Sequence, residues 1–169
     1  DFEISPTFKK NYLDTEQWQQ KPGSLPVEFG CSGSAYDVSG HYAYIFGGKR
    51  LDYWLSDGLW RFNLHSLEFD RLWGDGGTQH PSVRWGATLI VDPDDDMLYL
   101  YGGRNENWQW NNELWAYHMS EDRWEMLSPS CQAGPSCPPA AAGSALLRSG
   151  TPHAVTMALG TPNPTWQET

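Results

Sequence analysis

The sequence predicts an all-β fold made of short strands, and three observations support this. Aromatic residues are abundant: the 169 residues include ten Trp, eight Tyr and six Phe, and aromatic side chains favour strands. Seventeen Gly and twelve Pro divide the sequence into short segments, as turns between strands require. A pattern of apolar and glycine residues also occurs twice at a fixed spacing, which indicates repeated structural units.

The repeat is clearest around two pairs of glycines, which are 55 residues apart: Gly47 matches Gly102. Each pair ends an apolar run, YIFGG at 44–48 and YLYGG at 99–103. A second apolar run follows, LWRFNL or LWAYHM, and an aromatic residue lies five positions after it, Phe69 or Trp124. This spacing without gaps predicts two copies of one structural unit.

Each unit also begins with a matched strand pattern. Residues 34–38 and 87–91 precede a turn and then the run that ends in the glycine pair. The order is therefore strand a, hairpin, strand b, glycine pair, long loop, strand c, turn and strand d. Four antiparallel strands in this order predict one blade of a β-propeller.

Weaker matches extend the pattern to both ends of the chain. Leu13 and Trp18 share the five-residue spacing of strands c and d, whereas 138–147 and 153–160 are similar to strands a and b. We therefore expect four segments: the end of a preceding blade at 1–25, blade 1 at 26–80, blade 2 at 81–137, and the partly irregular start of a further blade at 138–169. Residues 128–136, rich in Pro and Ser, are expected to form an irregular loop at the end of blade 2.

The repeat resembles the kelch repeat. The shared marks are the glycine pair after an apolar strand, the Leu-Trp-x-Phe/Tyr strand, the later aromatic residue, and a lead-in of the form Pro81-x-x-Arg84-x-Gly86. Blade 1 departs from this lead-in, because Glu28 stands roughly where blade 2 has Arg84. The resemblance implies an all-β, incomplete kelch β-propeller that docks proteins or peptides.

Most of the matched residues have structural explanations. Glycine suits a crowded turn with positive φ, large aromatic residues at repeated positions pack neighbouring blades together, and the resemblance implies that Arg84 ties strands by hydrogen bonds. The expected structural residues are Gly47, Gly48, Trp60, Phe69, Arg84, Gly102, Gly103, Trp115 and Trp124.

The long b–c loops, 49–58 and 104–113, are expected on one face together with the d–a loops. Each b–c loop has a base after the glycine pair and then Trp, and Tyr, Trp and Arg dominate interface hot spots. The alternative is that the loop Trp residues turn inward and pad their own loops. The candidate partner-binding residues are Lys49, Arg50, Tyr53, Trp54, His80, Arg104, Trp108, Trp110 and Asn111.

We therefore expect a protein-interaction module or scaffold and no enzyme, catalytic residue, cofactor or metal. The alternative is part of a kelch-like propeller enzyme, such as a metal-dependent oxidase or specifier protein, with its site outside this segment. The five His residues are scattered through different strands and turns, which does not favour a metal site. The acidic run at 92–96 lacks the calcium-loop pattern and predicts a solvated hairpin turn.

Charge and cysteine content suggest the environment of the protein. A net charge of −10 repels nucleic acid, and no apolar run is long enough to span a membrane. Three cysteines favour free thiols and a cytoplasmic location, with a Cys131–Cys137 bridge as the alternative. About three blades of sequence cannot close a ring of four to eight, so further blades are expected from the same or another chain.

Overall fold

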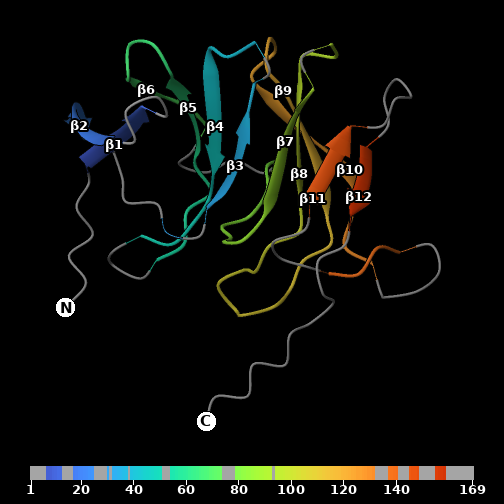
Figure 1. The fold of residues 1–169 in the computed structure, drawn as a ribbon. Helices are drawn as coiled ribbons and strands as arrows, with labels where there is room; N and C mark the ends of the chain where they lie inside the picture. Colours follow the sequence, from blue (N-terminus) through green and yellow to red (C-terminus); the bar gives the residue numbers. More distant parts are fainter. Residues whose placement is uncertain are drawn as a thin grey trace.

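The structure is a computed structural model, and it consists of antiparallel β-sheets (Figure 1). It describes residues 7–12, 17–24, 30, 32–37, 39–50, 54–73, 79–92, 94–131, 137–140, 145–148 and 155–158. These residues contain no helix. The described part of the chain thus has no helix that is long and apolar enough to cross a membrane.

Two four-stranded sheets form the centre of the molecule, and in both the strands pair in chain order. The first sheet consists of β3 (Gly33–Tyr36), β4 (Tyr42–Phe46), β5 (Leu59–Asn63) and β6 (Phe69–Trp73). The second sheet consists of β7 (Thr88–Asp92), β8 (Met97–Tyr101), β9 (Leu114–His118) and β10 (Arg123–Ser128). The expected order of strands a to d is confirmed in each.

A two-stranded hairpin lies on either side of these sheets in the sequence. The first pairs β1 (Thr7–Tyr12) with β2 (Gln17–Ser24), and the last pairs β11 (Ala145–Arg148) with β12 (Val155–Ala158). Trp18 pairs with Asn11 on the facing strand, much as Trp124 pairs with Tyr117. The assignment of these hairpins to neighbouring blades, and the four segment boundaries, stay predictions.

The two sheets repeat each other in register, including their loops. A shift of 55 residues converts the bounds of β4 and β5 into those of β8 and β9. The same shift relates hydrogen bonds outside the strands: Gly47 N to Gly58 O (3.0 Å) corresponds to Gly102 N to Glu113 O (3.3 Å). The repeat read from the sequence is therefore a repeat of backbone structure.

The innermost strands of successive units lie side by side, with β3 beside β7 and β7 beside β11 (Figure 1). The main core lies between the two sheets. It joins Tyr44, Phe46 and Leu59 of the first sheet to Leu89, Val91, Leu98, Leu100, Trp115, Tyr117 and Trp124 of the second. Apolar side chains that alternate along each strand produce this buried face.

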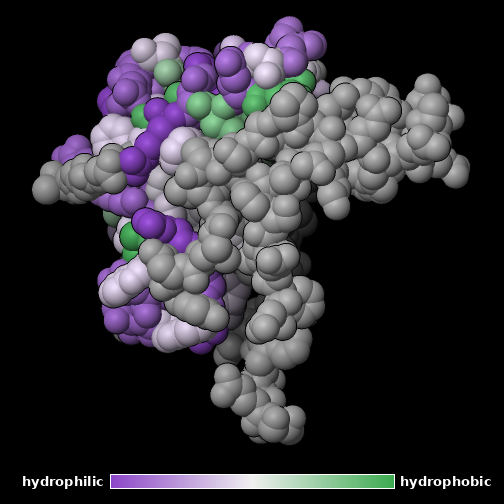
Figure 2. Space-filling view, turned by 90° about the vertical axis from the view of Figure 1, so that its left-hand side faces the viewer, coloured by the Kyte–Doolittle hydropathy of each residue, from purple (hydrophilic) through white to green (hydrophobic). Residues whose placement is uncertain are grey.

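The opposite face of the second sheet buries a smaller cluster of Tyr99, Tyr101 and Ala116. The Tyr101 hydroxyl donates a hydrogen bond to the carbonyl oxygen of Pro139, 2.8 Å away. The second sheet is thus packed on both faces, as a blade within a propeller must be. Figure 2, which views the side at the left of Figure 1, shows mainly hydrophilic side chains on the coloured surface, with hydrophobic ones in a band near the top.

The glycine pairs make the tight turns that the sequence predicts. All four have positive φ, at 65° and 101° for Gly47 and Gly48, and at 70° and 91° for Gly102 and Gly103. A Cβ on Gly47 would lie 2.4 Å from the carbonyl oxygen of Arg84. The atom that crowds Gly47 most closely therefore belongs to the backbone of the next unit.

Three expectations need correction. Cys131 and Cys137 form a disulfide, so the favoured interpretation of free thiols is wrong for this pair; the cytoplasmic location relied on it and stays a prediction with less support. Asp92 is buried, because it lies in β7, so the acidic turn at 94–96 is solvated only in part. Ser128 ends β10, although we expected 128–136 to be irregular; residues 132–136 lie outside the described part.

Candidate functional site

Two long loops lie at the lower end of the sheets in Figure 1 and carry most of the candidate binding residues. We call residues 47–58 the first loop and residues 102–113 the second loop. Each returns on itself through a matched pair of backbone bridges: Lys49 with Leu55 in the first, and Arg104 with Trp110 in the second. The fixed spacing between strands b and c therefore brings equivalent loop positions to the same end of neighbouring blades.

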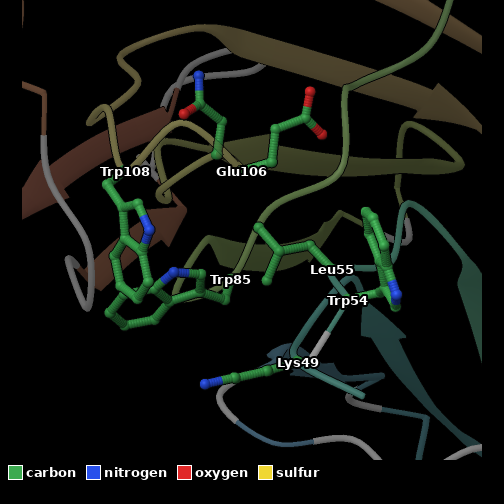
Figure 3. A pocket seen from close by; sticks show the side chains of 7 residues that line it. Lys49, Trp54, Leu55, Trp85, Glu106 and Trp108 are labelled. Carbon is green, nitrogen blue, oxygen red and sulfur yellow. The ribbon is translucent and has the colours of Figure 1, made fainter. Parts of the chain in front are cut away.

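A pocket of about 460 Å³ lies between these loops. Figure 3 shows Trp85 and Trp108 on one side, Leu55 and Trp54 on the other, and Lys49 and Glu106 at opposite edges. The exposed fraction is 72% for Trp54 and 61% for Trp108. Its lining residues are Lys49, Trp54, Leu55, Trp85, Asn105, Glu106 and Trp108. The walls are mainly aromatic and aliphatic, with one base and one acid at the rim.

Arg104 holds the aromatic side of the pocket in place. Its guanidinium carbon lies 4.7 Å from the ring centroid of Trp108 and 4.9 Å from that of Trp110. Its Nε also donates a 2.7 Å hydrogen bond to the carbonyl oxygen of Trp108. The rings of Trp108 and Trp110 in turn pack against Trp85, with centroids 6.4 and 6.0 Å away. Cation–π and ring contacts thus fix the position of the exposed Trp108.

The tip of the second loop is folded around Asn105. Its side-chain oxygen accepts hydrogen bonds from the backbone N–H groups of Asn107 and Gln109, each 3.0 Å long. Trp108 then adopts a φ of 60°, in the left-handed region that large side chains rarely enter. Strained residues of this kind persist where surrounding contacts over-determine them, and they cluster at functional sites.

A buried ion pair supports the base of the second loop. Arg84 Nη2 lies 2.8 Å from Oε2 of Glu113, which also accepts a 2.9 Å hydrogen bond from the indole of Trp115. Burial would raise the pKa of Glu113, but the hydrogen bonds from Arg84 and Trp115 and the charge of Arg84 outweigh it and lower the pKa. Glu113 is therefore held as a carboxylate at neutral pH.

The structure gathers some of the candidate binding residues and separates others. Lys49, Trp54 and Trp108 line the pocket, and Arg104 and Trp110 lie behind Trp108. Trp110 turns inward in this way, as the padding alternative describes, whereas Trp54 and Trp108 are exposed.

The remaining candidates have other surroundings. His80 lies against Trp73 and Asp57, and buried Asn111 accepts a hydrogen bond from the N–H of Glu113. Arg50 is exposed, with its N–H bonded to the carbonyl of Trp54. Tyr53 lies outside the described residues.

Four pocket residues were missed in the sequence: Leu55, Trp85, Asn105 and Glu106. A signal existed for Trp85, because it lies in the lead-in to strand a and the d–a and b–c loops share one face. The other three lie within the b–c loops that were predicted for this face, but no pattern distinguished them from the other loop residues. Among the residues that the structure describes, no three His, Cys, Asp or Glu side chains gather as a metal site.

Comparisons with known proteins identify the repeat. A model of the kelch motif matches residues 94–130. The chain is 29% identical over 102 residues to tip elongation aberrant protein 1 of Schizosaccharomyces pombe, a match that covers 60% of the chain and 9% of that protein.

It is also 28% identical over 92 residues to the flagellar outer arm dynein alpha chain of Chlamydomonas reinhardtii, covering 52% of the chain and 2% of that protein. The chain thus spans less than a tenth of either relative. The strand order, the repeated glycine turns and the motif match agree: residues 94–130 contain a kelch motif, and the two four-stranded antiparallel sheets are consistent with incomplete kelch blades.

Proposed function

We propose that this chain is part of a kelch-type interaction module that docks a partner protein or peptide on the face bearing the first and second loops. The pocket between the loops is the observation that carries the proposal. Trp54 and Trp108 expose most of their side chains on either side of it. Exposed large aromatic residues that cluster on a surface are typical of interaction sites.

The chemistry of the pocket suits an apolar side chain of the partner. Trp54, Leu55, Trp85 and Trp108 supply apolar surface, and the base and acid at the rim can orient polar groups of the bound chain. Since Arg104 already holds Trp108, binding would cost little additional ordering of that ring. The expected absence of nucleic-acid binding stays a prediction, supported by the net charge of −10.

The proposal can be tested by selecting peptides from a phage-displayed library on the full-length protein. The selected peptides should bind Trp54→Ala and Trp108→Ala at least about 30-fold more weakly, the loss typical of a hot-spot residue of 2 kcal/mol or more. Met126→Ala is the matched control, since Met126 is an exposed apolar residue on β10 that does not line this pocket.

Isothermal titration calorimetry should show unchanged affinity for the Met126→Ala control. Peptides that bind all three variants as tightly as the natural protein would place the docking site elsewhere. A selection that yields no peptide at all would contradict the proposal of a peptide-docking face.

A further inference from the structure

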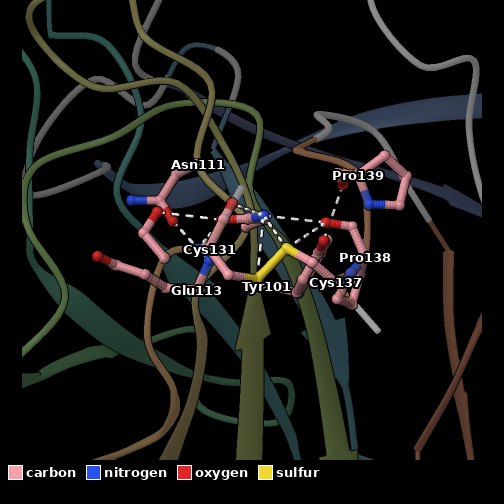
Figure 4. Close-up of a disulfide and its surroundings, with 9 residues drawn as sticks. Tyr101, Asn111, Glu113, Cys131, Cys137, Pro138 and Pro139 are labelled. Atoms are coloured by element: carbon pink, nitrogen blue, oxygen red, sulfur yellow. Dashed lines mark hydrogen bonds between the residues drawn. A yellow bond between two sulfur atoms is a disulfide. The ribbon is translucent and has the colours of Figure 1, made fainter. Parts of the chain in front are cut away.

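Cys131 and Cys137, which follow β10 in the sequence, form a disulfide, and the described residues beside it contact the second loop (Figure 4). We call Ser130, Cys131, Cys137 and Pro138 the disulfide segment. Cys131 and Cys137 are six positions apart, and the residues that flank the disulfide carry the polar groups that contact the second loop. The disulfide therefore keeps both ends of the segment at one place.

Asn112 of the second loop forms hydrogen bonds with residues on both sides of the disulfide. Its Nδ2 lies 2.9 Å from the carbonyl oxygen of Cys131, 3.0 Å from that of Pro138 and 3.0 Å from Sγ of Cys137. Its Oδ1 accepts hydrogen bonds from Ser130 Oγ at 3.0 Å and from the N–H of Cys131 at 3.2 Å. Asn112 is only 4% exposed, so these partners replace water for a buried amide.

The amide of Asn112 can reach the carbonyl oxygens of both Cys131 and Pro138 with its two N–H donors only while these two residues stay close together. Asn112 is two residues beyond Trp110, whose ring packs on Arg104 and Trp85 at the back of the pocket. Its neighbours Asn111 and Glu113 are also bonded, to Gly103 and Arg84. The disulfide segment is therefore one of the supports at the end of the second loop that enters β9.

We propose that Asn112 and the Cys131–Cys137 disulfide form a redox-sensitive clasp that positions the second loop and, through it, the partner-docking pocket. The ordering of the loop does not depend on the proposed function, whereas the effect on partner binding rests on it. When the disulfide is reduced, the two ends of the segment can separate, and Asn112 then loses part of its set of partners.

The chemical step requires a dithiol as reductant. The bond between Sγ of Cys131 and Sγ of Cys137 breaks, and each sulfur gains one electron and one proton. The dithiol loses two electrons and two protons and forms its own disulfide. Reoxidation by a disulfide of the same class reverses the step.

The first measurement establishes the disulfide. Trypsin cleaves after Arg123 and Arg148, so one peptide, 124–148, carries both cysteines. From the full-length protein alkylated without reduction, this peptide should be free of alkyl groups and lighter by two hydrogen atoms than its reduced form. Two alkylated cysteines in the unreduced native protein would overturn the proposal.

The second measurement follows hydrogen exchange of the backbone amides at 104–113 and at Cys131. Dithiothreitol should speed exchange there by about tenfold or more, as loss of a loop closure predicts, and leave β4 and β8 unchanged. The double variant Cys131→Ser/Cys137→Ser should show the faster exchange without reductant and no further response to it. Unchanged exchange in both cases would overturn the clasp.

Asn112→Ala separates the role of the amide from that of the disulfide. It should reproduce the faster exchange while the disulfide is intact, whereas Asn107→Ala, at an exposed position of the same loop, should not. If Asn112→Ala does not fold, the cysteine variant and the reductant still decide the question.

Peptide binding then distinguishes this inference from the proposed function. Faster exchange with weaker binding of the selected peptides on reduction supports both. Faster exchange with binding that is unaffected by Trp108→Ala supports the clasp and contradicts the docking pocket. Binding that depends on Trp108 but is unchanged by reduction, with unchanged exchange, contradicts the clasp alone.

Discussion

Arg84 connects the glycine turns of the two blades through different parts of one residue. Its carbonyl oxygen accepts a 2.8 Å hydrogen bond from the N–H of Gly48, and its Nη1 donates a 3.1 Å hydrogen bond to the carbonyl oxygen of Gly102. The side chain is 0% exposed. A buried guanidinium needs a nearby carboxylate, because an unpaired charge in the interior is costly. Glu113 provides it, at the start of strand c in the same blade.

Removing that carboxylate should destabilise the protein strongly. Glu113→Ala leaves the charge of Arg84 buried without a partner, and we expect the free energy of unfolding to fall by about 3 kcal/mol. Urea unfolding of the full-length protein at pH 7 measures it. Glu68→Ala, at an exposed position, should change the free energy of unfolding by no more than about 0.5 kcal/mol. If Glu113→Ala and Glu68→Ala change the free energy of unfolding equally, the ion pair between Arg84 and Glu113 does not stabilise the fold.

The same pair predicts a dependence on pH. The folded pKa of Glu113 is lowered from 4.5, so the unfolded chain takes up a proton first as the pH falls. The stability from this group is therefore present above pH 4.5 and is lost as the pH falls through the lower, folded value. Glu113→Gln should remove this component, so its unfolding free energy should change less between pH 5 and pH 3 than that of the natural protein. If the unfolding free energies of the natural protein and of Glu113→Gln change equally between pH 5 and pH 3, the lowered pKa of Glu113 does not contribute to this pH dependence.

At the scale of strands, the repeated aromatic residues of the two sheets pack against both the preceding and the following unit. Tyr44 and Phe46 of β4 face the second sheet, and the equivalent Tyr99 and Tyr101 of β8 lie in the separate cluster on its opposite face. Each b strand therefore presents its aromatic residues to the following unit. Trp115 of β9 faces the preceding unit and closes the core from the other side.

Trp115 and Trp54 offer the same substitution in opposite surroundings. Trp115→Ala should lower the free energy of unfolding by about 3–5 kcal/mol, because it opens a cavity in the core between the sheets. Trp54→Ala should cost less than about 1 kcal/mol, since Trp54 is 72% exposed. Thermal melts of both variants of the full-length protein measure the two losses of stability. A larger loss for Trp54→Ala than for Trp115→Ala would contradict the assignment of Trp115 to the core and Trp54 to an exposed loop.

Features that repeat along the chain could be predicted, and features that occur once could not. Gly47, Trp115 and Trp124 were identifiable because each has a counterpart 55 residues away, and periodic spacing reports periodic structure. Asn112 and the disulfide segment have no such counterpart. Their contact joins two irregular segments through a single side chain, and no local pattern encodes which loop residue meets another. Trp85 could have been recognised from its place in the lead-in to strand a, whereas Glu106 was marked only by its place in a b–c loop.

At the scale of the molecule, the described sheets stand side by side and do not close into a ring. The inner strands β3, β7 and β11 lie in sequence along one side, and the first sheet packs one face against the second. By the 55-residue register, Ala43 and Ile45 stand on the first sheet where Leu98 and Leu100 stand on the second, and these two are buried against the preceding sheet. The first sheet is thus built to receive a preceding blade in the same way.

We therefore predict that the 169-residue chain is stable only when further blades, from the same or another chain, complete the ring. An open arc exposes the outer faces of its terminal units and the hydrogen-bonding groups of its strands, and both favour association. Size-exclusion chromatography with light scattering should show the isolated chain as oligomers or aggregates, and extension or coexpression with the completing blades should relieve this. Because the pocket face would gain loops from the added blades, affinity for the selected peptides should rise in the completed ring. A soluble monomer of 19.1 kDa that unfolds in one sharp transition would contradict the prediction, since nothing would then be missing from the fold.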